Sequence, residues 1–182
     1  MDLMYPKGWP ELFMQHSGDA LGLCIAMDTD RTPGDELTLQ KLVCYLERVE
    51  WLMIYGRQTY EFLRMATRPA PRLRRLALGS QPTGPRSPRN QVTQDFVVPS
   101  DLFAGHVPSL YALLLNGLPI DPSSPLLSTN LTLLALIRGQ PKYHTRGRFL
   151  SLLDLIEVLR RMPRLEMLLM NDVLTLPQQM GR

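Results

Sequence analysis

The chain has 182 residues, a formal net charge of +3, 45% hydrophobic residues and 20% charged residues. This length is enough for one domain with a buried core, and the composition excludes wholesale disorder. The charge is too small to demand a nucleic acid or an anionic membrane as the partner. Leucine is the unusual residue, because it fills 35 positions in a chain that also has 16 prolines. The chain therefore places leucine repeatedly and interrupts its elements often.

The compartment is indicated by what the sequence lacks. Two cysteines, Cys24 and Cys44, are too few for a disulfide scaffold, and we expect buried thiols of an intracellular protein. The first residues lack the apolar core of a signal peptide, and no apolar run approaches the roughly 20 residues of a membrane span. We expect a cytoplasmic or nuclear protein without membrane contact.

Several elements are predicted in chain order. Apolar alternation over residues 21–27 predicts a strand, and apolar spacings of three and four predict helices over 36–48 and, more briefly, 58–66. The clearest helix is expected over 148–162. Its expected core-facing stripe is Phe149, Leu152, Leu153, Ile156 and Leu159.

A repeated pattern connects these elements. Residues 71–79, 108–116 and 163–171 all fit Pro-x-Leu-x-x-Leu-x-(Leu/Met)-(Gly/Asn), and looser copies begin at Val49 and Leu131. The last two apolar positions alternate with period two, so they share one face of a short strand. The proline lacks an N–H donor and belongs before the strand, while Gly or Asn ends it in a turn.

One such unit cannot bury its own leucines, whereas stacked neighbours can. The pattern predicts an α/β fold: an irregular leucine-rich-repeat solenoid with short parallel strands on its concave face and helices or loops on its convex face. We expect one domain over residues 1–182 with five to six irregular repeats, and an exposed proline-rich insertion at 79–95.

Four segments resemble a known family, namely 9–23, 98–110, 122–127 and 155–166. Together they are similar to the leucine-rich-repeat region of the F-box-like proteins of mushroom-forming (basidiomycete) fungi. The resemblance implies the substrate-recruiting arm of a Skp1–cullin ubiquitin ligase adaptor. The F-box itself is missing, so we expect a chain truncated at its N-terminus, which contacts Skp1 only if an F-box lies upstream. The regular asparagine of the repeat is also absent, which favours an irregular arc.

The positions between the leucines should face the concave side, where a protein ligand would bind. Trp, Tyr and Arg are the residues that most often dominate binding interfaces. The predicted partner-binding residues are Trp51, Tyr55, Arg74, Arg75, Tyr111 and Glu166. The alternative is an inert sheet face.

No constellation in the sequence points to catalysis, a cofactor or a metal, since His16, His106 and His144 lie far apart outside any ligand pattern. We therefore expect a non-catalytic protein-interaction module rather than an enzyme. The alternative is nucleic-acid or acidic-protein binding through the arginine-rich stretch 57–89. Its arginines are not interleaved with aromatic residues, which makes nucleic acid the weaker expectation.

Overall fold

The structure is a computed structural model of the chain. It describes residues 21–29, 36–56, 58–80, 97–128, 130–138 and 150–174. Residues 1–20, which the sequence suggests contain a short helix from Trp9 to His16 and a turn at residues 17–19, and nearly all of the proline-rich insertion, lie outside these ranges.

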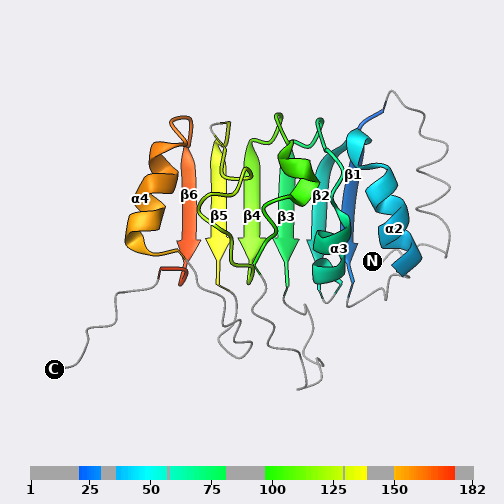
Figure 1. The fold of residues 1–182 in the computed structure, drawn as a ribbon, viewed down its shortest axis with the longest axis horizontal. Coiled ribbons are helices and arrows are strands. Elements are labelled where there is room, and N and C mark those ends of the chain that lie inside the picture. The colour runs from blue at the N-terminus through cyan, green and yellow to red at the C-terminus, as the bar shows by residue number, and fades with distance from the viewer. Residues whose placement is uncertain are drawn as a thin grey trace, which may run out of the picture.

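Six strands form one parallel sheet in which each strand lies beside the next one in the chain (Figure 1). The strands are β1 (Leu23–Asp28), β2 (Val49–Tyr55), β3 (Arg75–Gly79), β4 (Ala112–Asn116), β5 (Leu133–Ile137) and β6 (Met167–Asn171). The helices are α2 (Glu36–Cys44), η1 (Leu46–Arg48), α3 (Thr59–Met65), η2 (Leu102–Gly105) and α4 (Leu152–Arg160). The predicted α/β class is confirmed.

The register of the sheet follows the repeat found in the sequence. The first patterned leucine of the strict copies is Leu73, Leu110 or Leu165, and the looser copies begin at Val49 and Leu131. The residues two positions after these five fall in one row across the sheet: Trp51, Arg75, Ala112, Leu133 and Met167. The copies are therefore equivalent in space, and each begins within two residues of a strand.

The core lies against one face of the sheet. The next row along the strands is leucine throughout, and Leu52, Leu76, Leu113 and Leu134 are at most 1% exposed. The same buried cluster contains residues of the helices, which places the helices on this face. The helix residues include Leu39 and Leu42 of α2, Phe62 and Leu63 of α3, and Leu155 and Val158 of α4.

The connections that lead into β3, β4 and β5 each place a leucine in the core just before the strand. Leu73, Leu110 and Leu131, each just before a strand, are fully buried. The N–H groups of Leu73 and Leu110 donate to the carbonyls of Ala70 and Val107, which form tight turns around the prolines that introduce β3 and β4. The prolines thus lie outside the strands, as the missing N–H donor requires.

The predicted inward stripe of the last helix is wrong. Leu152, Leu153 and Ile156 of α4 are exposed, while Leu155 and Val158 are buried. A capping box fixes the start of this helix: the Asp154 N–H donates to the Ser151 hydroxyl, and the Ser151 N–H donates to the Asp154 carboxylate. Because α4 is apolar on two faces, periodicity alone could not decide which face is buried.

Two smaller expectations also need correction. Gly79 belongs to β3 and is buried under Tyr55, so the insertion begins after it. Cys24 and Cys44 are exposed free thiols rather than buried ones. Cys24 lies on the uncovered face of the edge strand β1, and the Cys44 thiol at the end of α2 donates to the Gln40 carbonyl.

No helix among the described residues is both long enough and apolar enough to cross a membrane.

Candidate functional site

The face of the sheet opposite the core, called here the open face, carries the candidate site. No helix in the described ranges contributes a residue to it. Two of its rows cross all six strands. They are Cys24, Trp51, Arg75, Ala112, Leu133 and Met167, and Ala26, Met53, Ala77, Leu114, Ala135 and Leu169. Arg75 is the one charged residue in these two rows, so the open face is a mainly apolar surface.

Four of the six predicted site residues gather where β2, β3 and β4 begin. Trp51 is 39% exposed and lies beside Arg75 in the register. The Arg75 Nε donates to the Tyr111 hydroxyl at 2.5 Å, and its guanidinium lies 5.5 Å from the centre of the Tyr111 ring. Arg74 lies on the same strand segment and is linked by backbone hydrogen bonds to both neighbouring strands. We call Trp51, Arg74, Arg75 and Tyr111 the aromatic–arginine cluster.

The two arginines of the cluster differ in their electrostatic surroundings. Arg74 has a carboxylate partner, because its guanidinium lies 3.8 Å from the Glu50 carboxylate. Arg75 contacts the neutral Tyr111, and no ion pair of Arg75 is found among the described residues. The contact with Tyr111 orients the Arg75 guanidinium without neutralising it, so Arg75 can still pair with an incoming anion.

Tyr55 lies on the open face but at the far end of β2. It is four residues from Trp51, or roughly 13 Å along an extended strand. Its ring covers Gly79, where an added Cβ would lie 2.2 Å from the Tyr55 Cδ1 atom. Partial burial raises the pKa of the Tyr55 phenol. Tyr55 is therefore a separate contact point rather than a member of the cluster.

Glu166 also lies apart from the cluster. Its N–H donates to the Thr132 carbonyl next to β5, which places Glu166 at the start of β6. Three strand spacings separate β6 from β3, or roughly 14 Å. The structure thus places all six predicted residues at their expected strand positions, but it brings only four of them together.

Apolar residues that the sequence did not single out lie between the six predicted partner-binding residues. Met53, Leu114 and Leu133 are half-buried on the open face, and Met167 and Leu169 are 56% and 50% exposed. Alternation with the buried leucines could have identified them, because every second residue of a strand shares a face. They extend the candidate surface across the whole sheet.

The arginine-rich stretch does not form one patch in the part of the chain that the structure describes. Arg64 lies on α3, 3.9 Å from the Glu61 carboxylate, whereas Arg74 lies just before β3, 3.8 Å from the Glu50 carboxylate, and Arg75 lies on the open face. Arg68 and Arg72 are in the loop between α3 and β3. Arg57, Arg86 and Arg89 lie outside the described residues. No described contact favours nucleic-acid binding through this stretch.

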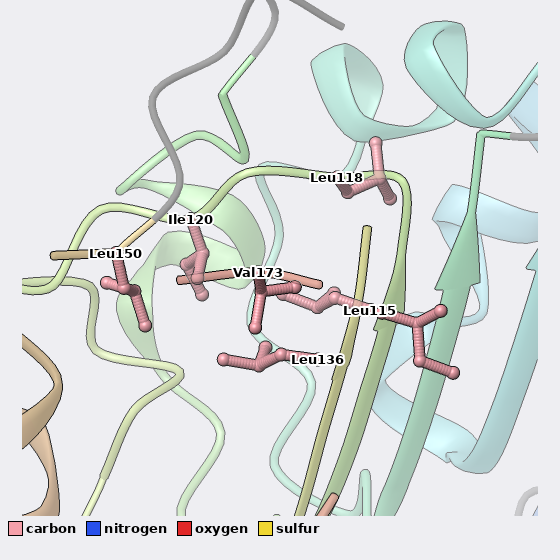
Figure 2. Close-up of a pocket in the computed structure, with 7 residues that line it drawn as sticks. Leu115, Leu118, Ile120, Leu136, Leu150 and Val173 are labelled. Carbon is pink, nitrogen blue, oxygen red and sulfur yellow. The ribbon is translucent and has the colours of Figure 1, made fainter. Parts of the chain in front are cut away.

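The described part of the molecule has a small pocket on the covered side, near the carboxyl ends of the last strands. Its volume is only about 10 Å³, about what one water molecule needs. Figure 2 shows aliphatic side chains from separate segments turned toward it. They include Leu115 of β4, Leu136 of β5, and Leu118, Ile120, Leu150 and Val173. A space this small and apolar suits core packing rather than a ligand.

Within the described ranges, no group of three or more His, Cys, Asp or Glu side chains is placed to hold a metal ion. Comparisons with protein-family models, with curated proteins and with solved structures find no match for this chain.

Proposed function

We propose that this chain is a non-catalytic protein-interaction module that binds its partner through the open face. The observation that carries the proposal is the composition of that face: it is apolar in two rows across the sheet, with the aromatic–arginine cluster at its edge. All-parallel sheets normally have both faces covered. An apolar sheet face that the described residues leave open is therefore well suited to burial by another protein.

The cluster has the residue types that most often dominate binding energy. Trp51 offers a large exposed apolar surface, and Arg75 offers a pre-oriented guanidinium held by Tyr111. A side chain already fixed in its bound orientation loses less entropy when a partner arrives. The favoured contact is an apolar surface of the partner that presents a carboxylate toward Arg75.

The finer architecture that we propose is an irregular leucine-rich-repeat solenoid with the open face as its concave side. Its support is the sequential order of the parallel strands and the common register of the repeat copies. Aligned positions from Trp51 to Met167 are separated by 24, 37, 21 and 34 residues. Two of these intervals fall in the usual range of 20–29 residues, and two contain insertions.

The resemblance of the sequence to fungal F-box-like proteins supplies a specific context for this module. We place it as the substrate-recruiting arm of a ubiquitin-ligase adaptor in the cytoplasm or nucleus. In this context the partner on the open face is a protein destined for ubiquitination. Skp1 would be contacted only through an F-box upstream in a longer chain.

Affinity capture with matched variants tests the proposed surface. The immobilised chain is incubated with a basidiomycete extract, and retained proteins are compared for wild type and the double variant Trp51→Ala/Arg75→Ala. The control, Arg68→Ala/Val97→Ala, also removes one arginine and one exposed apolar side chain, but away from the open face. We expect a specific protein to be retained by wild type and the control and reduced at least about tenfold by the double variant. Equal retention by all three chains would remove the open face as the binding surface.

A further inference from the structure

Exposed large apolar side chains concentrate at one end of the sheet. Of the ten in the described residues, seven belong to α4, β6 and the residues just after β6: Leu152, Leu153, Ile156, Met167, Leu168, Leu169 and Leu174. Helix α4 lies at the β6 end of the molecule (Figure 1). We call Leu152, Leu153, Ile156 and Leu168 the end surface, because these four do not belong to the open face.

Leu168 shows that this end differs from the rest of the sheet. It occupies the same row as Leu52, Leu76, Leu113 and Leu134, which are at most 1% exposed, yet it is 40% exposed. Each interior leucine is covered by a neighbouring strand on both sides, whereas Leu168 has β5 on one side only. Burial of Leu168 to the same degree requires another element beside β6.

Helix α4 has apolar residues on two sides. Leu155 and Val158 pack into the core, while Leu153 is 77% exposed and Leu152 is 56% exposed. An ordinary surface helix has one apolar stripe and a polar opposite side. A helix that is apolar on two sides is typical of one that lies between two packed layers.

The outer edge of β6 is open to a further strand. In the part of the chain that the structure describes, β6 pairs only with β5. Residues Met167–Asn171 contain neither a charge nor a proline, although natural edge strands are commonly protected by such residues. The backbone groups on this edge can therefore form a new ladder of hydrogen bonds.

The charges of α4 identify a second copy of this chain as the occupant. Glu157 and Arg160 are exposed and lie one turn apart, with the acid nearer the start of the helix, whereas Asp154 is used in the capping box and Arg161 donates to the Pro122 carbonyl. Two such helices related by a two-fold axis perpendicular to them run antiparallel, so Glu157 of one can face Arg160 of the other. Their dipoles also oppose favourably. A two-fold interface needs this kind of self-complementarity.

We propose that two copies of this chain associate through their end surfaces, with the two α4 helices antiparallel and the two β6 edges side by side. The sheet then continues from one copy into the other, and Leu168 and Leu153 of both copies become buried. This interface is separate from the open face, so it does not depend on the proposed function.

Analytical ultracentrifugation of the full chain over a roughly hundredfold range of concentration tests the proposal. We expect a reversible monomer–dimer equilibrium that Leu153→Glu weakens at least tenfold. The control is Leu21→Glu, because Leu21 is 61% exposed and precedes β1 at the other end of the sheet. It should leave the dimer intact. A monomer at every concentration, a dimer insensitive to Leu153→Glu, or open-ended association that Leu21→Glu also blocks would each overturn the two-fold dimer.

A charge exchange tests the antiparallel arrangement by itself. Glu157→Arg and Arg160→Glu, each alone, should weaken the dimer because like charges then meet across the two-fold axis. An equimolar mixture of the two variants should restore it, since each altered residue then faces an opposite charge. Both side chains are exposed, so neither change disturbs the core. A mixture that associates no better than either variant alone contradicts the antiparallel pairing of α4.

Discussion

Arg75 places a positive charge on a sheet face that is otherwise apolar, and Tyr111 holds that charge in position. The hydrogen bond from Nε holds the guanidinium beside the Tyr111 hydroxyl, with its central carbon 5.5 Å from the ring centre. The outer guanidinium nitrogens are then available as a paired donor, the geometry that matches a carboxylate. Lysine at this position would keep the charge but lose the planar paired donor.

An unusual backbone stretch at Phe103 and Ala104 gives a prediction at the level of one residue. Both have left-handed φ angles, 56° and 53°, which are unfavourable for residues with a Cβ atom. Ala104 is exposed, so Ala104→Gly removes the strain without opening a cavity. We expect this change to raise the free energy of unfolding by about 0.5–1 kcal/mol, after the larger unfolded-state entropy of glycine is deducted.

Urea unfolding measures this effect, with Ala26→Gly as the control. Ala26 is exposed in strand β1, where glycine should lower the free energy of unfolding by about 0.5–1 kcal/mol. If Ala104→Gly destabilises the chain as Ala26→Gly does, the left-handed turn imposes no strain.

Asp121 gives a pH-dependent prediction. Its carboxylate accepts hydrogen bonds from the Ser123 hydroxyl at 2.5 Å and the Ser123 N–H at 2.7 Å, which lower the pKa of Asp121 below 3.8. Because the folded pKa is depressed, the associated stability is present above pH 3.8 and is lost as the pH falls through the folded pKa. In an NMR titration, Ser123→Ala should raise the pKa of Asp121 part of the way to 3.8, since the backbone bond remains. Ser109→Ala is the control; an equal pKa in all three chains would contradict the assigned cause.

At the level of elements, α4 shows how a helix can be positioned by its start rather than by its apolar stripe. The capping box at Ser151 and Asp154 fixes where the helix begins, and the exposure of Leu152, Leu153 and Ile156 follows from that start. The orientation of α4 can be tested by replacing one leucine on each of its two sides with alanine.

We expect Leu155→Ala to lower the free energy of unfolding by about 2–3 kcal/mol, because Leu155 is only 6% exposed and its removal leaves a cavity. The matched change Leu153→Ala, on the opposite side of the same helix, should alter the free energy of unfolding of the monomer by no more than about 0.5 kcal/mol. Denaturant unfolding at a concentration where the chain is monomeric compares the two. A larger loss of unfolding free energy for Leu153→Ala than for Leu155→Ala would show instead that Leu153 faces the core, as the sequence alone suggested.

The same elements show how far the sequence could predict the structure. The strands and their register were predictable, because proline, leucine and a turn residue recur at fixed positions in residues 71–79, 108–116 and 163–171. Which face of α4 is buried was not predictable, since both of its sides are apolar. The separation of Glu166 and Tyr55 from the aromatic–arginine cluster follows from the spacing along and between stacked strands, so the repeat pattern already implied it.

At the scale of the whole molecule, the described helices cover one face of the sheet and leave the other open. The described helices all contribute to the buried side, and the core between them and the sheet is made mainly of leucines. Among the described residues, most of the exposed large apolar side chains lie on the open face or the end surface. One suits a different protein, and the other suits a second copy.

The most direct test of the central claim is site-specific photo-crosslinking in cells that contain the natural partners. A photoreactive phenylalanine analogue replaces Trp51 on the open face or, as the matched control, Val97, which is exposed in the segment before η2. We predict that the analogue at position 51 forms a covalent adduct with one distinct protein and that the analogue at position 97 does not. An adduct from position 97 with none from position 51 would contradict binding through the open face.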